Sequence, residues 1–248
     1  MMKTLCAYST AILIFAASFL LTAFKAKSDN QVVATVPVPE AVIIESPSVS
    51  VTALYNEIGL QNYGLSKEAF EQGIKGLNYL NKSGTINNSD IITIIDFSLP
   101  ATEKRLFVID LKNNKVLYNT YVAHGRNSGE ITANRFSNKN KSCQSSLGFY
   151  VTGDTYQGKH GYSLRLEGLE RGINDNAMKR GIVMHSAWYV NEKLAERKGY
   201  VGRSEGCPAI SKTVYKPIIS NIKDGTCLFI YSPNNTYASH SDILKQAS

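Results

Sequence analysis

The chain lacks the motifs that mark several functional classes. No HExxH sequence and no closely spaced pair of metal ligands occurs, which argues against a zinc peptidase that would use its scattered histidines and a cysteine. No nucleotide or flavin motif and no internal repeat is present. The formal net charge is +7, but the basic residues are scattered rather than blocked. We therefore expect no metal, no other cofactor and no nucleic-acid partner.

The first 26 residues form a long apolar segment. Lys3 precedes a nearly continuous run of apolar or small residues from Leu5 to Phe24, and Lys25 ends it. This order is typical of a secretory signal peptide. The run also approaches the ~20 residues that span a bilayer, so a retained membrane anchor is the alternative. Either way, we expect the rest of the chain to be exported to the periplasm or cell envelope of a bacterium, with membrane attachment only through this segment.

Two further segments precede the region rich in strands. Residues 27–50 contain Pro37, Pro39 and Pro47 with neighbouring serines, which predicts an extended tether. Residues 51–84 have helical spacing of apolar residues, with Ser66 as an N-cap, and predict a small helical segment.

The remainder, residues 85–248, is predicted to be one mainly β domain. Its predicted strands are short, β-branched and aromatic, and turn residues separate them: 91–97, 105–111, 115–123, 147–153, 162–168, 181–187 and 226–232. Residues 112–114 form a hairpin turn between two of these strands. Many short strands of this kind favour a β-sandwich or barrel-like core with a few peripheral helices.

Cysteine is scarce, and its number is odd once Cys6 of the apolar segment is set aside. Cys143, Cys207 and Cys227 remain, so at least one thiol has no disulfide partner within the chain. Cys227 lies in an apolar run and is predicted to be buried, with a bond to Cys143 left open.

Cys207 has the sequence surroundings of a nucleophile. His185 ends an apolar strand, and Cys207 follows twenty-two residues later between Gly206 and Pro208. A thiol attacks as the thiolate, and an imidazole is its usual base. Gly206 lets the backbone turn so that amide groups can face an oxyanion. On spacing alone, a disulfide-bonded Cys207 and a structural His185 remain the alternative.

This constellation resembles the L,D-transpeptidases, the YkuD-like family. Their signature is a strand-end histidine, a gap of about twenty residues and then Ser-His-Gly-Cys. The matching residues here are His185, Ser204, Gly206 and Cys207. Residues 145–149 (SSLGF) resemble the family's upstream Thr-Pro-x-Gly-x-Phe segment, and the hairpin at 105–123 resembles its opening strands. The resemblance covers roughly residues 103–232.

The sequence departs from the family pattern at two places beside the nucleophile. Glu205 replaces the second histidine, and Pro208-Ala209 replaces the aliphatic-Arg pair that usually follows the cysteine. The resemblance is therefore to a divergent branch of murein L,D-transpeptidase catalytic domains. Loss of the arginine leaves substrate orientation and the reaction outcome open.

The resemblance implies a YkuD-like β-sandwich and a cysteine acyl-transferase that acts on peptidoglycan stem peptides. His185 is then the base and Ser204 part of the catalytic loop, and the amides around Gly206 and Cys207 hold the oxyanion. It also implies acylation by carbapenems. An L,D-carboxypeptidase, an amidase on the same substrate and a non-catalytic peptidoglycan-binding module are the alternatives.

Five further residues are candidates for substrate binding: Arg203, Glu205, His160, Tyr162 and Trp188. A surface salt bridge is the alternative for Arg203, an exposed loop position for His160, and core packing for the two aromatic residues. His124 is predicted to be structural, and the Asn174-Asp175 pair to be an ordinary turn or cap rather than a support for His185.

Overall fold

The computed structural model describes residues 50–247. The predicted signal segment (1–26) and nearly all of the predicted tether (27–50) lie outside the described residues. In the part described, no helix combines the length and the apolar content needed to cross a membrane.

The predicted helical segment contains two α-helices. They are α1 (Val51–Ile58) and α2 (Lys67–Lys82), with a 3-10 turn at Leu60–Tyr63 between them. The Ser66 hydroxyl accepts a hydrogen bond of 3.2 Å from Ala69 N–H, which confirms the predicted N-cap. The buried residues of both helices belong to the same hydrophobic core as the strands. The domain boundary at residue 85 stays a prediction.

Nine strands form one sheet in the order β3-β2-β1-β9-β5-β6-β7-β8-β4. Their bounds are β1 (Asn88–Asp96), β2 (Leu106–Asp110), β3 (Lys115–Thr120), β4 (Val122–Ala123), β5 (Gly148–Gly158), β6 (Gly161–Gly168), β7 (Val183–Ala187), β8 (Ala209–Ser211) and β9 (Thr226–Tyr231). The β2–β3 pair is antiparallel around the predicted turn at residues 112–114.

The single strand predicted over residues 115–123 is wrong, because the chain breaks at Tyr121. β3 lies at one end of the strand order and β4 at the other, although one residue separates them. The sheet must therefore curl until its two edges approach each other. A strand that changes sheets in this way is what a sandwich-like or barrel-like core requires.

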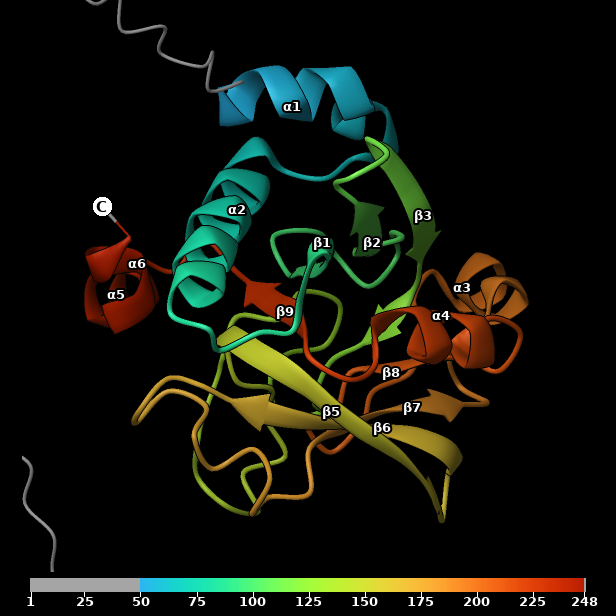
Figure 1. Ribbon diagram of the computed structural model, residues 1–248. Helices are drawn as coiled ribbons and strands as arrows, with labels where there is room; N and C mark the ends of the chain where they lie inside the picture. The colour runs from blue at the N-terminus through green and yellow to red at the C-terminus, as the bar shows by residue number, and fades with distance from the viewer. Residues whose placement is uncertain (1–49, 248) are drawn as a thin grey trace, which may run out of the picture. The chain divides into compact units, whose positions relative to one another are not determined.

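The last strand completes the centre of the sheet. β9 lies between β1 and β5, parallel to β1 and antiparallel to β5. Phe149 on β5 and Phe229 on β9 stack with ring centroids 4.2 Å apart in the core. Figure 1 shows α1 and α2 above the β1–β2–β9 layer, with β5 and β6 below it.

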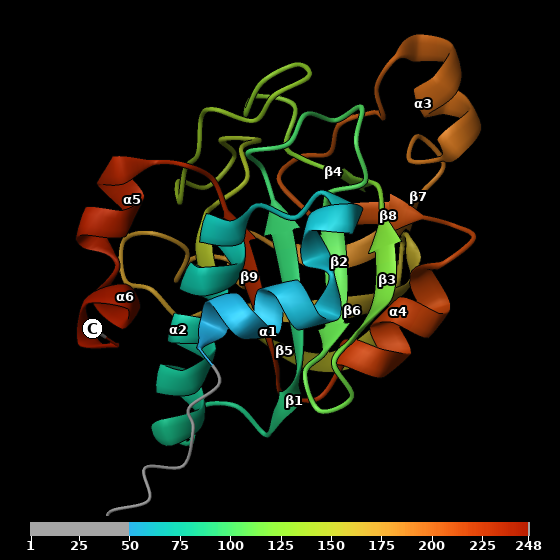
Figure 2. The same cartoon turned by 90° about the horizontal axis from the view of Figure 1, so that it is seen from above.

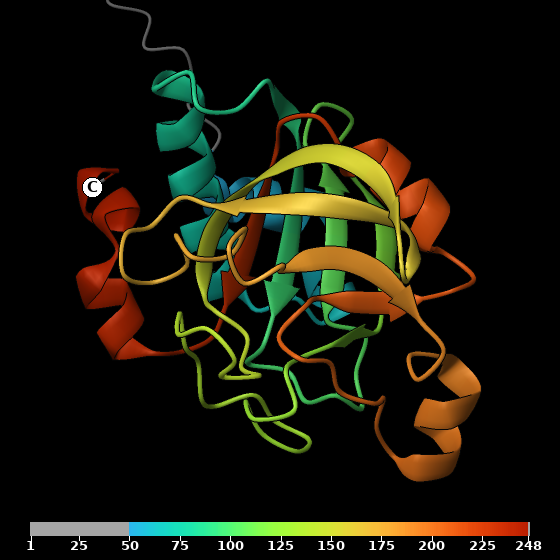
Figure 3. The same ribbon diagram turned by 90° about the horizontal axis from the view of Figure 1, so that it is seen from below.

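The predicted fold class is confirmed: the chain is mainly β, with peripheral helices and a helical segment at its start. Figure 2 shows α1 and α2 over β1 and β2, and Figure 3 shows β5 and β6 crossing the opposite side of β1 to β3. Four helices were not located from the sequence: α3 (Glu192–Lys198), α4 (Tyr215–Ile222), α5 (Asn235–His240) and α6 (Asp242–Gln246).

Candidate active site

The parallel pairing of β7 with β8 brings His185 and Cys207 together. His185 is opposite Ala209 in the register, and Cys207 precedes Ala209 by two residues. Cys207 lies in the bend that leads into β8. His185 and Cys207 both line one pocket of about 690 Å³. The loop and helix α3 between the two strands account for the twenty-two-residue gap.

The His185 ring is held in a defined tautomer. Nδ1 lies 2.9 Å from the backbone oxygen of Ser186, and a carbonyl oxygen only accepts, so Nδ1 carries the proton. Nε2 is therefore the basic nitrogen. Burial is the main cause that lowers the pKa of His185, and the positive charges of His160 and Lys159 lower it further. The ring is thus a neutral base at neutral pH.

The Cys207 thiol is also neutral at rest. Burial raises its pKa, while a backbone N–H group at Val183 and the positive charges of Arg180 and Lys159 act in the opposite direction. The sulfur is directed at the carbonyl oxygen of Gly181, 3.7 Å away. Within residues 50–247, no hydrogen bond joins it to the His185 ring.

Ser204 shapes the loop that carries the thiol. Its hydroxyl donates to the carbonyl oxygen of Cys207 at 2.7 Å and accepts from Gly206 N–H at 3.0 Å. Gly206 has φ +126°, which only glycine adopts readily. In this conformation the Gly206 amide donates to the Ser204 hydroxyl, and its expected role toward an oxyanion stays a prediction.

Arg180 is an important residue of the site that the sequence analysis missed. Its guanidinium donates to the carbonyl oxygens of Ser137 and Gln144 at 2.7 and 2.6 Å and to the Ser146 hydroxyl at 2.5 Å. These bonds fix the loop before β5 to the segment that leads into β7, the strand of His185. Its position just before the strand that bears His185 was the one feature of the sequence that pointed to Arg180. Position alone does not show which segments an arginine joins.

Three of the five predicted substrate-binding residues line the same pocket. The His160 ring stacks on His185, with ring centroids 4.1 Å apart. Glu205 forms an ion pair of 3.1 Å with Arg126, and Arg203 donates to the carbonyl oxygen of Gly129 at 3.1 Å. Arg203 forms no salt bridge within residues 50–247, which was the alternative considered for it.

The structure does not bring Tyr162 and Trp188 to this pocket. Trp188 is 71% exposed and lines a separate shallow pocket beside α3. Tyr162 packs partly buried against the hydrophobic core. Tyr189 lines the site instead, and its ring lies edge-on to the Trp188 ring, with centroids 5.8 Å apart. The sequence could not tell which of the two neighbouring aromatic residues faces inward.

The pocket is basic, although the sequence showed no basic block. Five cationic side chains from separate segments line it: Arg126, Lys141, Lys159, Arg180 and Arg203. Glu205 is the acidic residue among the lining residues, and Arg126 neutralises it. A concave site with this excess of positive charge favours anionic ligands.

The remaining candidates have structural roles. Asn174 is fully buried and bonds to backbone groups of Leu147, Phe149 and Glu170, away from His185.

Cys143, Cys207 and Cys227 are all free thiols. Cys227 is buried as expected. Over residues 50–247, no three histidine, cysteine, aspartate or glutamate side chains gather as a metal site would require.

Comparison with known proteins gives one extended match. Residues 61–231, well over half of the chain, match the family described as L,D-transpeptidase catalytic domain. A search of curated proteins finds no match.

Solved structures resemble the chain at low identity. An L,D-transpeptidase from Mycobacterium smegmatis is 13% identical over 58% of this chain and 59% of that chain, with a TM-score of 0.36. The enzyme from Stackebrandtia nassauensis is 14% identical over 75% and 77%, with a TM-score of 0.34. An L,D-transpeptidase solved in complex with imipenem is 15% identical over 57% and 59%, with a TM-score of 0.36. This chain covers less than two thirds of the first and third of these structures.

Proposed function

Because the chain belongs to the L,D-transpeptidase catalytic domain family, we propose that it is an exported cysteine acyl-transferase that acts on peptidoglycan stem peptides in the bacterial cell envelope. The observation that carries the proposal is the placement of two side chains. His185, whose basic nitrogen is Nε2, and the free thiol of Cys207 line the same pocket.

The first half-reaction forms a thioester. As the Cys207 sulfur attacks the carbonyl carbon of the scissile L,D peptide bond, Nε2 of His185 takes the thiol proton. The backbone N–H of Cys207 stabilises the developing oxyanion, together with the positive charge of Arg180, which lines the same pocket. The C–N bond then breaks, His185 returns the proton to the leaving nitrogen, and a C-terminal D-amino acid departs.

The second half-reaction consumes the thioester. An acceptor amine or a water molecule attacks the acyl carbon and gives a proton to His185, and the C–S bond breaks. The proton returns from His185 to the Cys207 sulfur. An amine yields a cross-link, and water yields the carboxypeptidase outcome. The five cations around Cys207 support a substrate with free carboxylates, because a peptide with a free C-terminus brings at least one.

Intact-protein mass spectrometry after exposure to imipenem tests the proposal. We expect a covalent adduct on wild type, its loss in Cys207→Ala and slower formation in His185→Ala. Cys143→Ala is the matched control, because Cys143 is a free thiol that lines the same pocket. It should retain the adduct. An adduct that disappears in Cys143→Ala instead, or no adduct on any variant, would refute the assignment of Cys207 and favour a wall-binding module.

A further inference from the structure

Trp188 is the chain's single tryptophan, and it is the most exposed large hydrophobic side chain of residues 50–247. It lines a hollow of about 290 Å³ together with Asn191, Lys193, Leu194 and Arg197. The last three belong to α3, which Figures 2 and 3 show at the margin of the molecule, beyond the end of β7. Tryptophan combines a large apolar face with a polar N–H group, so an exposed one suits a ligand platform.

The segment that carries the Trp188 ring is held in place. The Asn191 side chain donates to the carbonyl oxygen of Trp188 at 2.8 Å and accepts from Leu194 N–H at 2.8 Å, as the N-cap of α3. The Trp188 ring also contacts the Tyr189 ring, and the carbonyl oxygen of Tyr189 accepts from Gly202 N–H at 2.8 Å. A ring that is already ordered loses less freedom when a ligand binds, which favours affinity.

The Trp188 hollow borders the catalytic pocket. Tyr189 lines the pocket of Cys207, and its neighbour Trp188 lines the hollow. Trp188 follows His185 by three residues, so their Cα atoms lie within roughly 11 Å of each other. A stem peptide is attached to a glycan strand, and three extended residues cover roughly 10 Å. A donor peptide whose scissile bond lies at Cys207 can therefore place its sugar at Trp188.

The chemistry of the Trp188 hollow matches a neutral sugar ring. The C–H face of a pyranose packs on an aromatic ring through dispersion and the loss of apolar surface from water. Lys193 and Arg197 provide N–H donors for hydroxyl and acetamido oxygens, and neither forms an ion pair within residues 50–247. The volume is near the lower limit of roughly 300 Å³ for small-molecule sites, which suits one ring of a polymer.

We propose that Trp188, Lys193 and Arg197 form a subsite for the glycan strand that carries the donor stem peptide. The inference rests on the proposed function, because it assigns the sugar of the same substrate. The Trp188 ring packs against the face of one N-acetylated sugar, and the two cations donate to its oxygens. The protein then favours stem peptides that are still joined to glycan over free peptides.

Tryptophan fluorescence tests whether the hollow binds sugar. The protein is the Cys207→Ala variant, and the probe is chitotetraose, a tetramer of N-acetylglucosamine without peptide. Because Trp188 is the chain's single tryptophan, all of the tryptophan emission comes from the proposed subsite. We expect a saturable shift of the emission to shorter wavelength as the sugar displaces water from the ring. No shift at millimolar chitotetraose overturns the proposal.

Isothermal titration calorimetry with chitotetraose tests the role of the Trp188 ring. Trp188→Ala should weaken binding by roughly fivefold or more, because it removes the packing surface. Tyr63→Ala is the matched control, because Tyr63 is also an exposed aromatic residue, at 46%, and lies on the 3-10 turn between α1 and α2. It should change the affinity less than about twofold. Equal weakening in both variants overturns the assignment of Trp188.

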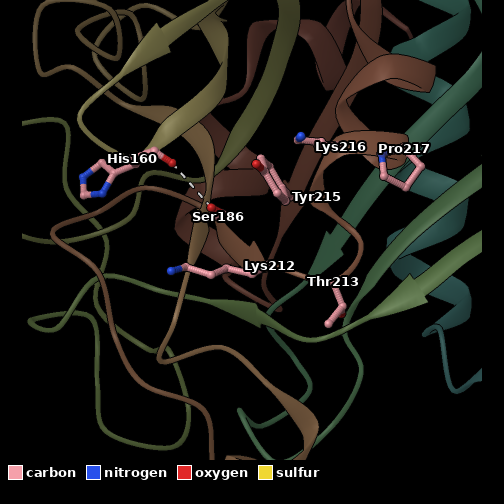
Figure 4. Close-up of a pocket in the computed structure, with 7 residues that line it drawn as sticks. All are labelled: His160, Ser186, Lys212, Thr213, Tyr215, Lys216 and Pro217. Carbon is pink, nitrogen blue, oxygen red and sulfur yellow. Dashed lines mark hydrogen bonds between the residues drawn. The ribbon is translucent and has the colours of Figure 1, made fainter.

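The same titration tests the two cations. Lys193→Ala with Arg197→Ala should weaken binding by roughly threefold, since each exposed polar contact contributes little. Lys212→Ala with Lys216→Ala is the matched control, because it removes two positive charges from a different pocket (Figure 4). It should leave the affinity within about twofold of wild type. Equal weakening in both pairs would show a general effect of charge and overturn the assignment of the cations.

An anionic membrane surface is the competing ligand for a tryptophan beside cations. Ala195 of α3 is buried, which leaves Leu194 as the other apolar residue of this helix. The helix therefore has no apolar face that could enter the lipid, and glycan is favoured. Vesicles of phosphatidylglycerol replace the sugar in the fluorescence titration to test this choice. A shift with vesicles and none with chitotetraose overturns the glycan assignment.

Turnover separates this inference from the proposed function. With Cys207 intact, wild type should have a higher kcat/KM for a disaccharide-linked tetrapeptide than for the free tetrapeptide, and Trp188→Ala should bring the ratio close to one. An imipenem adduct on wild type, with no preference for the linked peptide and no chitotetraose binding, overturns the subsite alone. Absence of the adduct refutes the proposed function, whereas a saturable fluorescence shift would still assign Trp188 to glycan.

Discussion

The guanidinium of Arg105 donates a hydrogen bond of 2.7 Å to Nδ1 of His124, and both side chains are fully buried. Nε2 of His124 therefore carries the proton and donates to the carbonyl oxygen of Gly129 at 3.2 Å. The backbone oxygen of His124 accepts from Ser204 N–H at 2.9 Å. A buried, hydrogen-bonded Arg105–His124 pair thus supports the loop that holds Cys207.

We expect Arg105→Ala to destabilise the fold by roughly 3–5 kcal/mol. Arg105 also donates to the carbonyl oxygens of Leu99 and Val122, and these acceptors would be left buried without a partner. Denaturant unfolding measures the loss. Arg197→Ala, an exposed arginine on α3, is the control and should stay within about 0.5 kcal/mol of wild type. A similar small effect in Arg105→Ala would contradict the prediction.

His124 should make the fold sensitive to acid. Burial is the main cause that lowers its pKa to about 4, and the charges of Arg105 and Arg203 act in the same direction. The His124 side chain takes up its proton near pH 6.5 in the unfolded chain and only near pH 4 in the folded chain. The stability that neutral His124 contributes to the fold is therefore fully present above pH 6.5 and is lost as pH falls toward 4. The loss reaches about 3 kcal/mol at pH 4.

The test compares unfolding free energies of wild type and His124→Asn at pH 7 and pH 4. The asparagine oxygen can still accept from Arg105 but does not titrate. We expect the variant to be less stable at pH 7 and to lose less stability on acidification. Equal losses in both proteins would show that His124 is not the group responsible.

The sequence predicted the strands with strong periodicity and the two residues with the clearest chemistry, His185 and Cys207. It missed β8, because a strand of three residues has no recognisable pattern, and the site depends on the pairing of β8 with β7. Of the five pocket cations, Arg203 was a candidate, whereas Arg126, Lys141, Lys159 and Arg180 were missed. Their grouping follows from long-range strand pairing, which spacing along the chain does not encode.

His160 should control the basicity of His185 through the ring stack. His160→Ala exposes the His185 ring and removes a neighbouring positive charge, and both changes raise the pKa of His185. NMR titration of the ring protons measures it. His160→Phe keeps an aromatic cover over His185, so it should leave the pKa lower than His160→Ala does. An unchanged or lower pKa in His160→Ala would be inconsistent with the stack.

Gly206→Ala should disturb the Cys207 loop more than an ordinary turn substitution. At φ +126° a new Cβ would lie 2.8 Å from the backbone oxygen of Gln144 and 3.1 Å from Ile182. Gly84→Ala is the control, because Gly84 also has positive φ but no atom within 4 Å of a new Cβ. We expect the control to lose about 1 kcal/mol of unfolding free energy and Gly206→Ala to lose at least twice that, measured by thermal unfolding. Equal losses would mean that the contact with Gln144 relaxes freely.

At Gly76, helix propensity and core packing have opposite effects on an alanine substitution. Alanine is favoured over glycine within a helix by roughly 1 kcal/mol, so Gly76→Ala on α2 should stabilise the protein if the helix alone decides. A new Cβ, however, would lie 2.1 Å from the Phe149 ring, which is itself stacked on Phe229. We expect a net loss of about 1–3 kcal/mol, because the ring cannot move without disturbing the core between β5 and β9.

Gly73→Ala, one turn earlier on α2, is the matched control. Its new Cβ would approach the terminal methyl of Ile94 at 3.1 Å, which can move by a few tenths of an ångström. The propensity gain should therefore survive in part, and the two substitutions should differ in unfolding free energy by at least ~1 kcal/mol. Equal effects would show that α2 shifts as a unit on the sheet, and that the close approach at Gly76 does not fix its position.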